Sequence, residues 1–316
     1  IGDANVEGKI DGNNSSFIIP DGLENLTFAP TIVISDKATI TPASGVEQDF
    51  SSPVIYTVTS EDGIVTTKYT VSVSGQIRDF GFDEWETIKS STSGSTEQYD
   101  VPKGLYGTSN PGIMTINEMF GSNLPELFSY TVSPVEGQSG KAAKLQTVYT
   151  YMFLNGMDFN ALLGGLVPYV TAGSLFTGIF KTDMNNTLNS TKFGVPFVGE
   201  PATFTGYYKY TPGTTYYNNK NEVVADKTDE CSIYAVLYEE LLDEENNNIP
   251  LNGDYNDPDL YIGSSKRIVM KAVLEDGTAK SDWTKFSIPF KLLEGKSYDA
   301  TKKYYLAIVC SSSAEG

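Results

Sequence analysis

Aromatic side chains in polar surroundings are the residues of this sequence best suited to binding chemistry. Trp85 follows two acidic residues, Trp283 begins a strand-like run after a polar turn, and Tyr216 and Tyr217 stand together in a loop rich in Gly and Asn. An aromatic ring offers a flat face on which the apolar face of a sugar stacks, while polar neighbours hydrogen-bond the sugar hydroxyls. The candidates for contact with a sugar are therefore Trp85, Tyr208, Tyr210, Tyr216, Tyr217 and Trp283.

A buried core is the alternative location for several of these rings. β-Sandwiches commonly bury Trp and alternating Tyr side chains, and this is the more usual place for Trp85 and Trp283. Alternation along a strand puts Tyr208 and Tyr210 on one face and Tyr207 on the other. The two adjacent loop tyrosines cannot both point into a core, so they are the stronger candidates for ligand contact.

Carboxylates offer a second chemistry, glycoside hydrolysis. It uses two carboxyl groups about 5–5.5 Å apart in retaining enzymes and about 6.5–9.5 Å apart in inverting ones. Asp83, Glu84 and Glu86 surround Trp85, but on a strand Glu84 and Glu86 share a face while Asp83 points away. Because 40 acidic residues produce such pairs by chance, no catalytic residue is assigned.

An acidic loop is the third candidate. Asp254, Asn256, Asp257 and Asp259 place oxygen ligands in a short segment, which is the chemistry that Ca²⁺ requires. The loop lacks the glycine at its sixth position and the distal Glu of an EF-hand. A solvated acidic loop explains the same residues. Calcium is therefore a possible ligand, and no other cofactor is expected.

Composition excludes several classes of function. The 316 residues contain no histidine, so neither a Ser-His-Asp triad nor an imidazole metal site can form. Cys231 and Cys310 are too few for a four-thiolate zinc site; they could form a disulfide or remain buried free thiols. The net charge of −18 argues against nucleic acid as a partner. No apolar stretch is long enough to predict a transmembrane segment.

The first 75 residues have the pattern of a small β-sandwich. Runs rich in β-branched residues alternate with turn residues at a spacing of about ten. Asp62-Gly63 between two alternating runs predicts a hairpin, with Val54, Tyr56 and Val58 on one face. The predicted strands are Phe17–Ile19, Thr31–Ile34, Ala38–Ile40, Val54–Val58 and Thr67–Val73.

Three blocks of this segment resemble a known module. They are Thr41–Gly45, Gln48–Pro53 and Tyr56–Gly63. On these residues the segment resembles the immunoglobulin-like modules that precede functional domains in surface lipoproteins of Bacteroidetes. The resemblance implies an immunoglobulin-like spacer domain over residues 1–75. The sequence pattern changes after Ser74-Gly75-Gln76, which is the predicted linker.

The remaining residues, 76–316, are also strand-like, with longer connections and little helical signal. Asn117–Phe128 and Asp158–Leu166 could each supply a short helix, limited by Pro125 and by Gly164-Gly165. An all-β segment of this length fits one large jelly-roll sandwich. The predicted strands are Ala142–Thr147, Ser174–Phe180, Thr203–Tyr210, Cys231–Tyr238, Arg267–Leu274, Trp283–Pro289 and Tyr304–Cys310.

Seven blocks of this second segment resemble a known domain. They are Phe82–Trp85, Gly140–Leu145, Ala172–Gly178, Gly194–Phe197, Phe204–Gly213, Ile233–Glu239 and Asp299–Tyr304. On these residues the segment resembles the putative carbohydrate metabolism domain of exported Bacteroidetes proteins, over most of residues 80–313. The resemblance implies a jelly roll akin to carbohydrate-binding modules and a setting in glycan use.

We therefore expect a glycan-binding or accessory protein of polysaccharide utilisation, with a polysaccharide or oligosaccharide as its partner. A glycoside hydrolase with a carboxylate pair is the first alternative, and an adhesion or protein-interaction module is the second. The resemblance also implies an exported protein of the periplasm or the outer-membrane surface, with a lipid anchor upstream of Ile1 in the precursor.

Overall fold

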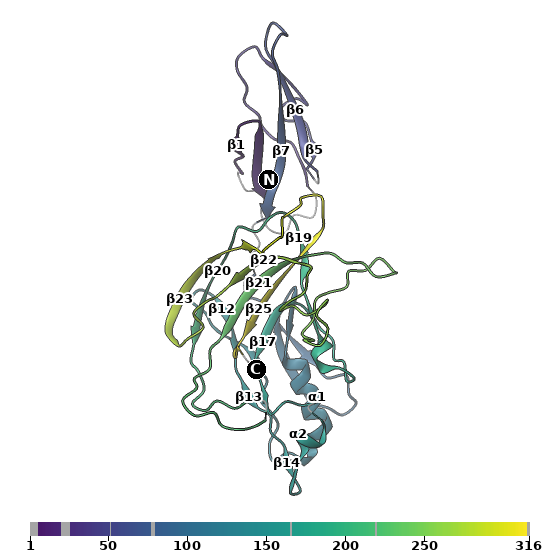
Figure 1. Cartoon of the computed structure of the whole chain (residues 1–316), viewed down its shortest axis with the longest axis vertical. Helices are drawn as coiled ribbons and strands as arrows, with labels where there is room; N and C mark the ends of the chain where they lie inside the picture. Colours follow the sequence, from purple (N-terminus) through teal and green to yellow (C-terminus); the bar gives the residue numbers. More distant parts are fainter. Residues whose placement is uncertain are drawn as a thin grey trace. The chain divides into compact units, whose positions relative to one another are not determined.

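The computed structural model confirms an all-β protein with sandwich architecture (Figure 1). The chain divides into two compact units, residues 1–80 with 198–201, and residues 81–197 with 202–316. None of the described helices is long and apolar enough to cross a membrane. The structure describes residues 6–19, 26–50, 52–76, 80–164, 166–218 and 220–314.

The smaller unit contains a five-stranded sheet in the order β1-β2-β7-β6-β4 and a separate pair, β3-β5. Strand β2 runs parallel to β7, and the other neighbours in the sheet are antiparallel. The strands are β1 (Lys9–Asp11), β2 (Asn14–Ile19), β3 (Thr27–Phe28), β4 (Thr39–Thr41), β5 (Gln48–Asp49), β6 (Val54–Thr59) and β7 (Thr66–Gln76).

The predicted hairpin is confirmed as β6-β7. Asp62 Oδ1 accepts hydrogen bonds from Ser60 Oγ at 2.6 Å and from Ile64 N at 3.0 Å, and Gly63 has a φ of 71°. Tyr56 of β6 is buried in the core of this unit. Two predictions are wrong: Thr31–Ile34 is not a strand, and Ser74–Gln76, the predicted linker, belongs to β7.

The larger unit is built on an antiparallel sheet in the order β10-β17-β25-β21-β22-β24, to whose strands β18 and β19 add short pairings. The predicted strands of this sheet are confirmed to within two residues at each end. The strands are β10 (Tyr106–Thr108), β17 (Ser174–Phe180), β18 (Thr191–Phe193), β19 (Val195–Phe197), β21 (Ser232–Glu239), β22 (Ile268–Val273), β24 (Lys291–Leu292) and β25 (Tyr304–Ser311).

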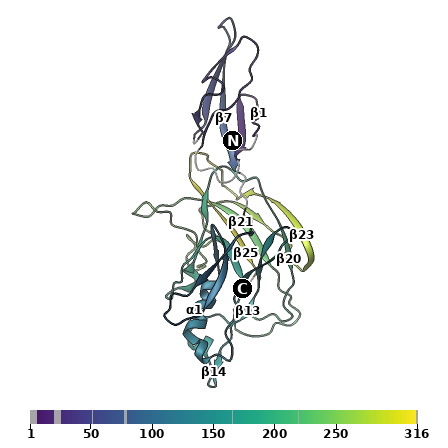
Figure 2. The ribbon, with the colours of Figure 1, turned by 180° about the vertical axis from the view of Figure 1, so that it is seen from behind.

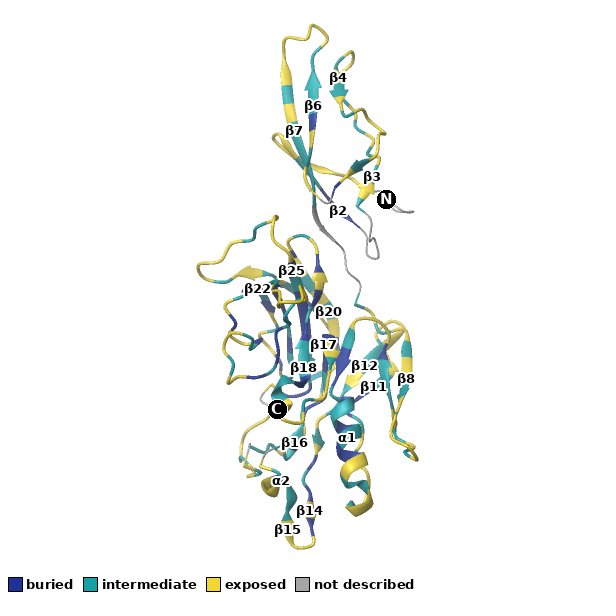
Figure 3. Cartoon of the chain, turned by 90° about the vertical axis from the view of Figure 1, so that its right-hand side faces the viewer, coloured by how far each residue is buried: buried dark blue, intermediate teal, exposed yellow. Residues whose placement is uncertain are grey.

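Both faces of the central strands are buried, as Figure 3 shows for β17 and β25. On one face, Val236 and Tyr238 pack with Leu251 and Ile262 from a long connection. On the other face, Ile233 packs against Tyr208 and Phe286 of a two-stranded antiparallel ribbon, β20-β23. The ribbons that complete the unit are β8 (Trp85–Lys89) with β9 (Gln98–Pro102), β11 (Val132–Glu136) with β12 (Lys141–Leu145), β13 (Val148–Tyr149) with β16 (Val170–Thr171), β14 (Phe153–Leu154) with β15 (Met157–Asp158), and β20 (Thr203–Tyr210) with β23 (Lys280–Pro289).

Helix α1 spans Asn110–Phe120 and therefore begins seven residues before the helix predicted at Asn117–Phe128. Pro111 lies in its first turn, where the missing N–H is not needed. The short helix α2, Phe159–Leu162, lies within the second predicted region. The hairpin β14-β15 projects beyond α1 (Figure 2). The short 3-10 helices are η1 (Gly121–Asn123) and η2 (Thr187–Ser190).

Candidate functional site

An aromatic cleft of about 1070 Å³ opens on the larger unit. The structure brings three of the predicted aromatic residues together here, Tyr210, Tyr216 and Tyr217. Its lining comes from the end of β20 with the loop that follows it, from segments 144–147, 160–161 and 167–170, and from Ser312-Ser313 after β25.

Tyr169 and Tyr255 also line the cleft, and the sequence analysis did not identify them. Tyr169 lies in a largely apolar stretch between Pro168 and Val170, which carries no local signal for binding. Tyr255 lies between two residues of the predicted metal loop, and its side chain is 65% exposed. An exposed ring inside a polar loop is the signal that could have identified Tyr255.

Tyr210 is positioned by the end of the central strand. Its hydroxyl group donates to the carbonyl of Ser312 at 3.1 Å. The Ser312 Oγ in turn accepts from Gly173 N at 2.9 Å and lies 2.8 Å from Thr147 Oγ1. Burial raises the pKa of Tyr210, and the nearby Asp229 carboxylate adds to the effect. The phenol therefore stays protonated, and its oxygen keeps acceptor capacity toward the cleft.

Tyr216 and Tyr217 are half-buried rings held by their own neighbours. The Lys227 ammonium lies 4.3 Å from the centroid of the Tyr216 ring, a cation–π arrangement. The Tyr217 ring stacks on Tyr149, with centroids 4.9 Å apart and planes at 27°. The Tyr149 hydroxyl donates to Asn221 Oδ1 at 2.8 Å. These contacts fix both rings before any ligand arrives, which lowers the entropic cost of binding.

Amide, hydroxyl, ammonium and carboxylate groups supply the polar part of the lining. Asn160 is buried beneath the cleft, where its Oδ1 accepts from Met152 N at 2.6 Å and its Nδ2 donates to Thr150 O at 3.0 Å. Among the described residues that line the cleft, Asp229 is the single carboxylate. The other polar side chains of the lining are Lys144, Gln146, Thr147, Lys209, Thr211, Thr215, Asn218, Ser312 and Ser313.

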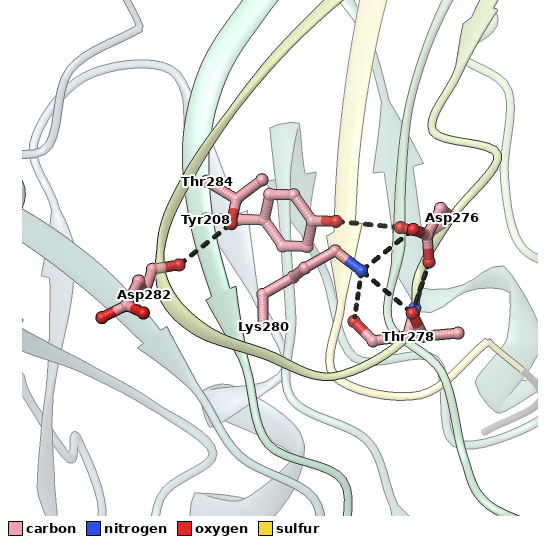
Figure 4. Close-up of polar contacts among 6 residues, drawn as sticks. All are labelled: Tyr208, Asp276, Thr278, Lys280, Asp282 and Thr284. Carbon is pink, nitrogen blue, oxygen red and sulfur yellow. Dashed lines mark hydrogen bonds and ion pairs between the residues drawn. The ribbon is translucent and has the colours of Figure 1, made fainter.

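Tyr208 lies in the core and does not line the cleft. Figure 4 shows its hydroxyl group directed at Asp276, whose carbonyl accepts at 2.9 Å. The Asp276 carboxylate also bonds Thr278 Oγ1 at 2.5 Å and Lys280 Nζ at 2.9 Å. These hydrogen bonds, of which the one from Thr278 has the largest effect, lower the pKa of Asp276 to about 2. Tyr208 therefore anchors the turn before β23, a structural role.

The two tryptophans lie outside the cleft lining. Trp283 is half-buried on β23, with Lys209 Nζ 5.3 Å from its ring centroid. Trp85 is half-buried on β8, and its Nε1 donates to Phe82 O at 2.6 Å. Both positions are intermediate between core and surface.

The acidic residues beside Trp85 have structural partners. Asp83 Oδ1 accepts from the backbone N–H of Lys141 at 2.9 Å, and Glu84 forms an exposed salt bridge with Lys103 at 3.3 Å. These contacts explain Asp83 and Glu84 without assigning a reaction to them.

The Asp254 and Asp257 carboxylates of the predicted metal loop accept hydrogen bonds from other residues of the chain. Asp254 is buried; its Oδ1 accepts from Asn256 N at 2.9 Å and its Oδ2 from Asn186 Nδ2 at 2.6 Å. Asp257 Oδ1 accepts from Asp259 N at 3.1 Å. No group of three or more metal-binding His, Cys, Asp or Glu side chains occurs among the described residues.

Calcium binding by this loop is untested, and calorimetry with a thermal melt decides between a calcium site and a solvated acidic loop. Heat of binding together with a melting temperature that rises with Ca²⁺ would support a site, because a ligand of the native state stabilises it. Because Asp254 and Asp257 already satisfy local donors, we expect neither signal. A saturable heat with Ca²⁺ but not with Mg²⁺ would contradict that expectation.

Both cysteines are free in the structure, and burial raises the pKa of Cys231 to about 11 and that of Cys310 to about 12. We expect slow labelling by a thiol reagent in the native protein and labelling of both thiols in denaturant without reductant. Two unreactive sulfurs in denaturant would instead indicate a disulfide.

The two thiols also make the stability of the protein depend on pH. Because their folded pKa values exceed the ordinary value of 9.0, the thiols favour the folded state below pH 9. This contribution to stability declines as the pH rises from 9 toward 11 and 12.

The fold and the cleft together define a β-sandwich protein with an aromatic, amide-lined surface hollow. The chain belongs to the family described as "Putative carbohydrate metabolism domain", whose model matches residues 81–316. Residues 1–73 match a second family model, described as "SGBP, N-terminal". The family resemblance of the larger part of the chain is thus confirmed.

Two examples illustrate the solved structures to which this chain is similar. One is described as a putative glycoside hydrolase from Bacteroides thetaiotaomicron VPI-5482; it is 30% identical, with 98% of this chain and 86% of that chain covered and a TM-score of 0.53. The other, described as a putative glycoside hydrolase from Bacteroides vulgatus ATCC 8482, is 24% identical, with 74% and 88% covered and a TM-score of 0.53, and it supports the fold alone. No curated protein matches this chain.

Proposed function

We propose that this protein binds a carbohydrate in the aromatic cleft and acts as a non-catalytic component of glycan utilisation. The observation that carries the proposal is the convergence of Tyr210, Tyr216 and Tyr217 on one cleft, beside side-chain amides and hydroxyl groups. Pre-positioned rings and polar groups are what a sugar requires of its binding site. The match to a carbohydrate metabolism domain and to an SGBP N-terminal domain supports the same role.

Hydrolysis is the second candidate function, favoured by the similarity to the 30% identical structure described as a putative glycoside hydrolase. Two facing carboxylates are needed for it, and at least one usually has a raised pKa. The described lining of the cleft offers Asp229 alone. In the described part of the chain, the carboxyl groups whose pKa is shifted are all shifted downward. These two observations favour binding over hydrolysis.

The SGBP-type domain supports a location at the surface or in the periplasm of a Bacteroidetes cell. We extend this to a lipid-anchored precursor on the outer membrane, as the resemblance to surface lipoproteins implies. Metabolic labelling of the full-length protein with radioactive palmitate tests the anchor. Unlabelled protein in the soluble periplasmic fraction would contradict it.

A glycan array followed by calorimetry and a reducing-sugar assay tests the function. We expect saturable binding of at least one glycan and no release of reducing ends. Absence of binding at high protein concentration would overturn the proposal. Reducing ends that appear with the wild-type protein and disappear in Asp229→Asn would support hydrolysis in its place.

A further inference from the structure

An exposed line of aromatic residues leads away from the cleft. Tyr149, Tyr151 and Phe153 alternate along one strand-like segment, and we call them the aromatic row. Phe153 is 60% exposed and Tyr149 is 44% exposed. The residues between and after them, Thr150, Met152 and Leu154, are buried. Period-two alternation thus gives this segment a core face and an aromatic outer face.

The core face of this segment is firmly held. Met152 and Leu154 pack against Ile113 and Ile116 of α1. The buried Asn160 amide also bonds the backbone on both sides of Tyr151. The aromatic row is therefore rigid, and large exposed rings on a rigid surface commonly mark a binding region.

The aromatic row is continuous with the cleft. Tyr149 stacks on Tyr217, and the Tyr151 ring centroid lies 5.7 Å from that of Tyr169; Tyr217 and Tyr169 both line the cleft. Within the row, the centroids of Tyr149 and Tyr151 are 5.8 Å apart, and those of Tyr151 and Phe153 are 6.2 Å apart. Ring contacts therefore run without interruption from the cleft to Phe153, the first residue of β14 in the β14-β15 hairpin.

We propose that the aromatic row extends the cleft and holds further sugar residues, so that the ligand is a glycan chain and not a mono- or disaccharide. This inference rests on the proposed function. Each ring supplies a flat face for stacking. The phenol oxygens of Tyr149 and Tyr169, which donate to Asn221 and Asp158, remain acceptors for sugar hydroxyls. Continuity with the cleft favours a chain over a separate protein partner.

The test compares chain lengths. Amylopectin, xyloglucan, galactomannan, laminarin and pectin are screened by affinity electrophoresis, and the two- and eight-residue oligosaccharides of each binder are titrated by calorimetry. We expect the wild-type protein to bind the longer form at least about tenfold more tightly. Phe153→Ala should weaken the longer form about five- to tenfold and leave the shorter form unchanged, because one stacked ring contributes about this much.

Met157→Ala is the matched control. Met157 lies on the same hairpin and is 51% exposed. It is paired with Leu154, so its side chain lies on the face of the hairpin opposite to that of Phe153. It should leave both affinities unchanged. Equal affinity for short and long forms would overturn the inference about the aromatic row but not the proposed function. An equal loss of affinity in Phe153→Ala and Met157→Ala would have the same consequence. No binding of any of these glycans would overturn the proposed function together with it.

Discussion

Replacing both Tyr216 and Tyr217 by Ala is expected to lower the affinity for the glycan about five- to 150-fold. Each ring lines the cleft and is held by a neighbour, Tyr216 by Lys227 and Tyr217 by Tyr149. An aromatic contact of this kind contributes about 0.5–1.5 kcal/mol beyond the area that it buries, so two rings give about 1–3 kcal/mol. Because about 1.4 kcal/mol corresponds to a factor of ten, calorimetry resolves the loss readily.

Two control variants separate stacking from hydrogen bonding and from general effects on the protein. Tyr216→Phe with Tyr217→Phe keeps both rings and should retain most of the affinity. Trp85→Ala removes a half-buried ring on β8 that does not line the cleft and whose Nε1 donates to Phe82 O. The proposed site is wrong if Trp85→Ala weakens binding as much as the double alanine variant does.

The substitution Asn110→Ala produces the largest loss of stability that we expect, about 3–5 kcal/mol. Asn110 is fully buried at the start of α1. Its Nδ2 donates to Asp100 O at 3.1 Å and Val132 O at 2.8 Å, and its Oδ1 accepts from Thr131 N at 3.0 Å and Val132 N at 2.9 Å. Alanine leaves the two N–H donors without that acceptor in a buried place, at a cost of about 1–3 kcal/mol for each, and it removes one donor from each carbonyl. The sum is consistent with a loss of about 3–5 kcal/mol.

Urea denaturation of the wild type and the variant measures this loss, as a lower midpoint with an unchanged slope. Asn185→Ala is the control, because Asn185 is an exposed residue of the same unit and its surface position predicts a change within about 0.5 kcal/mol. A loss below about 1 kcal/mol in Asn110→Ala would show that water or a rearranged backbone replaces the amide.

The four longer strands of the main sheet could be predicted from sequence because each carries its own evidence. Ser174–Phe180 in this sheet and Thr203–Tyr210 in the ribbon β20-β23 were predicted with the bounds that the structure has. Alternation and β-branched residues are local properties, and they report burial on one or both faces. The helix at Asn110–Phe120 was misplaced because its first turn contains Pro111 and Gly112, residues that usually indicate a break.

Chemical type identified candidates for the cleft but not their positions. Aromatic rings suit both a core and a sugar, and Tyr208 and Tyr210, two residues apart on β20, illustrate this. Tyr208 is buried against the turn before β23, while Tyr210 lines the cleft. The aromatic row was missed although Tyr149 and Tyr151 alternate with the buried Thr150. Alternation alone does not say which of two faces is covered.

The sequence by itself determined that this protein is all-β, that it lacks histidine chemistry, and that its larger part belongs to a carbohydrate metabolism family. Only the tertiary structure decided which rings share a cleft. Tyr210 bonds Ser312, 102 residues away, and Tyr149 stacks on Tyr217. Side-chain periodicity records the direction of a residue relative to its own strand. Which distant loops meet depends on how the strands order and pack, and no local pattern contains that information.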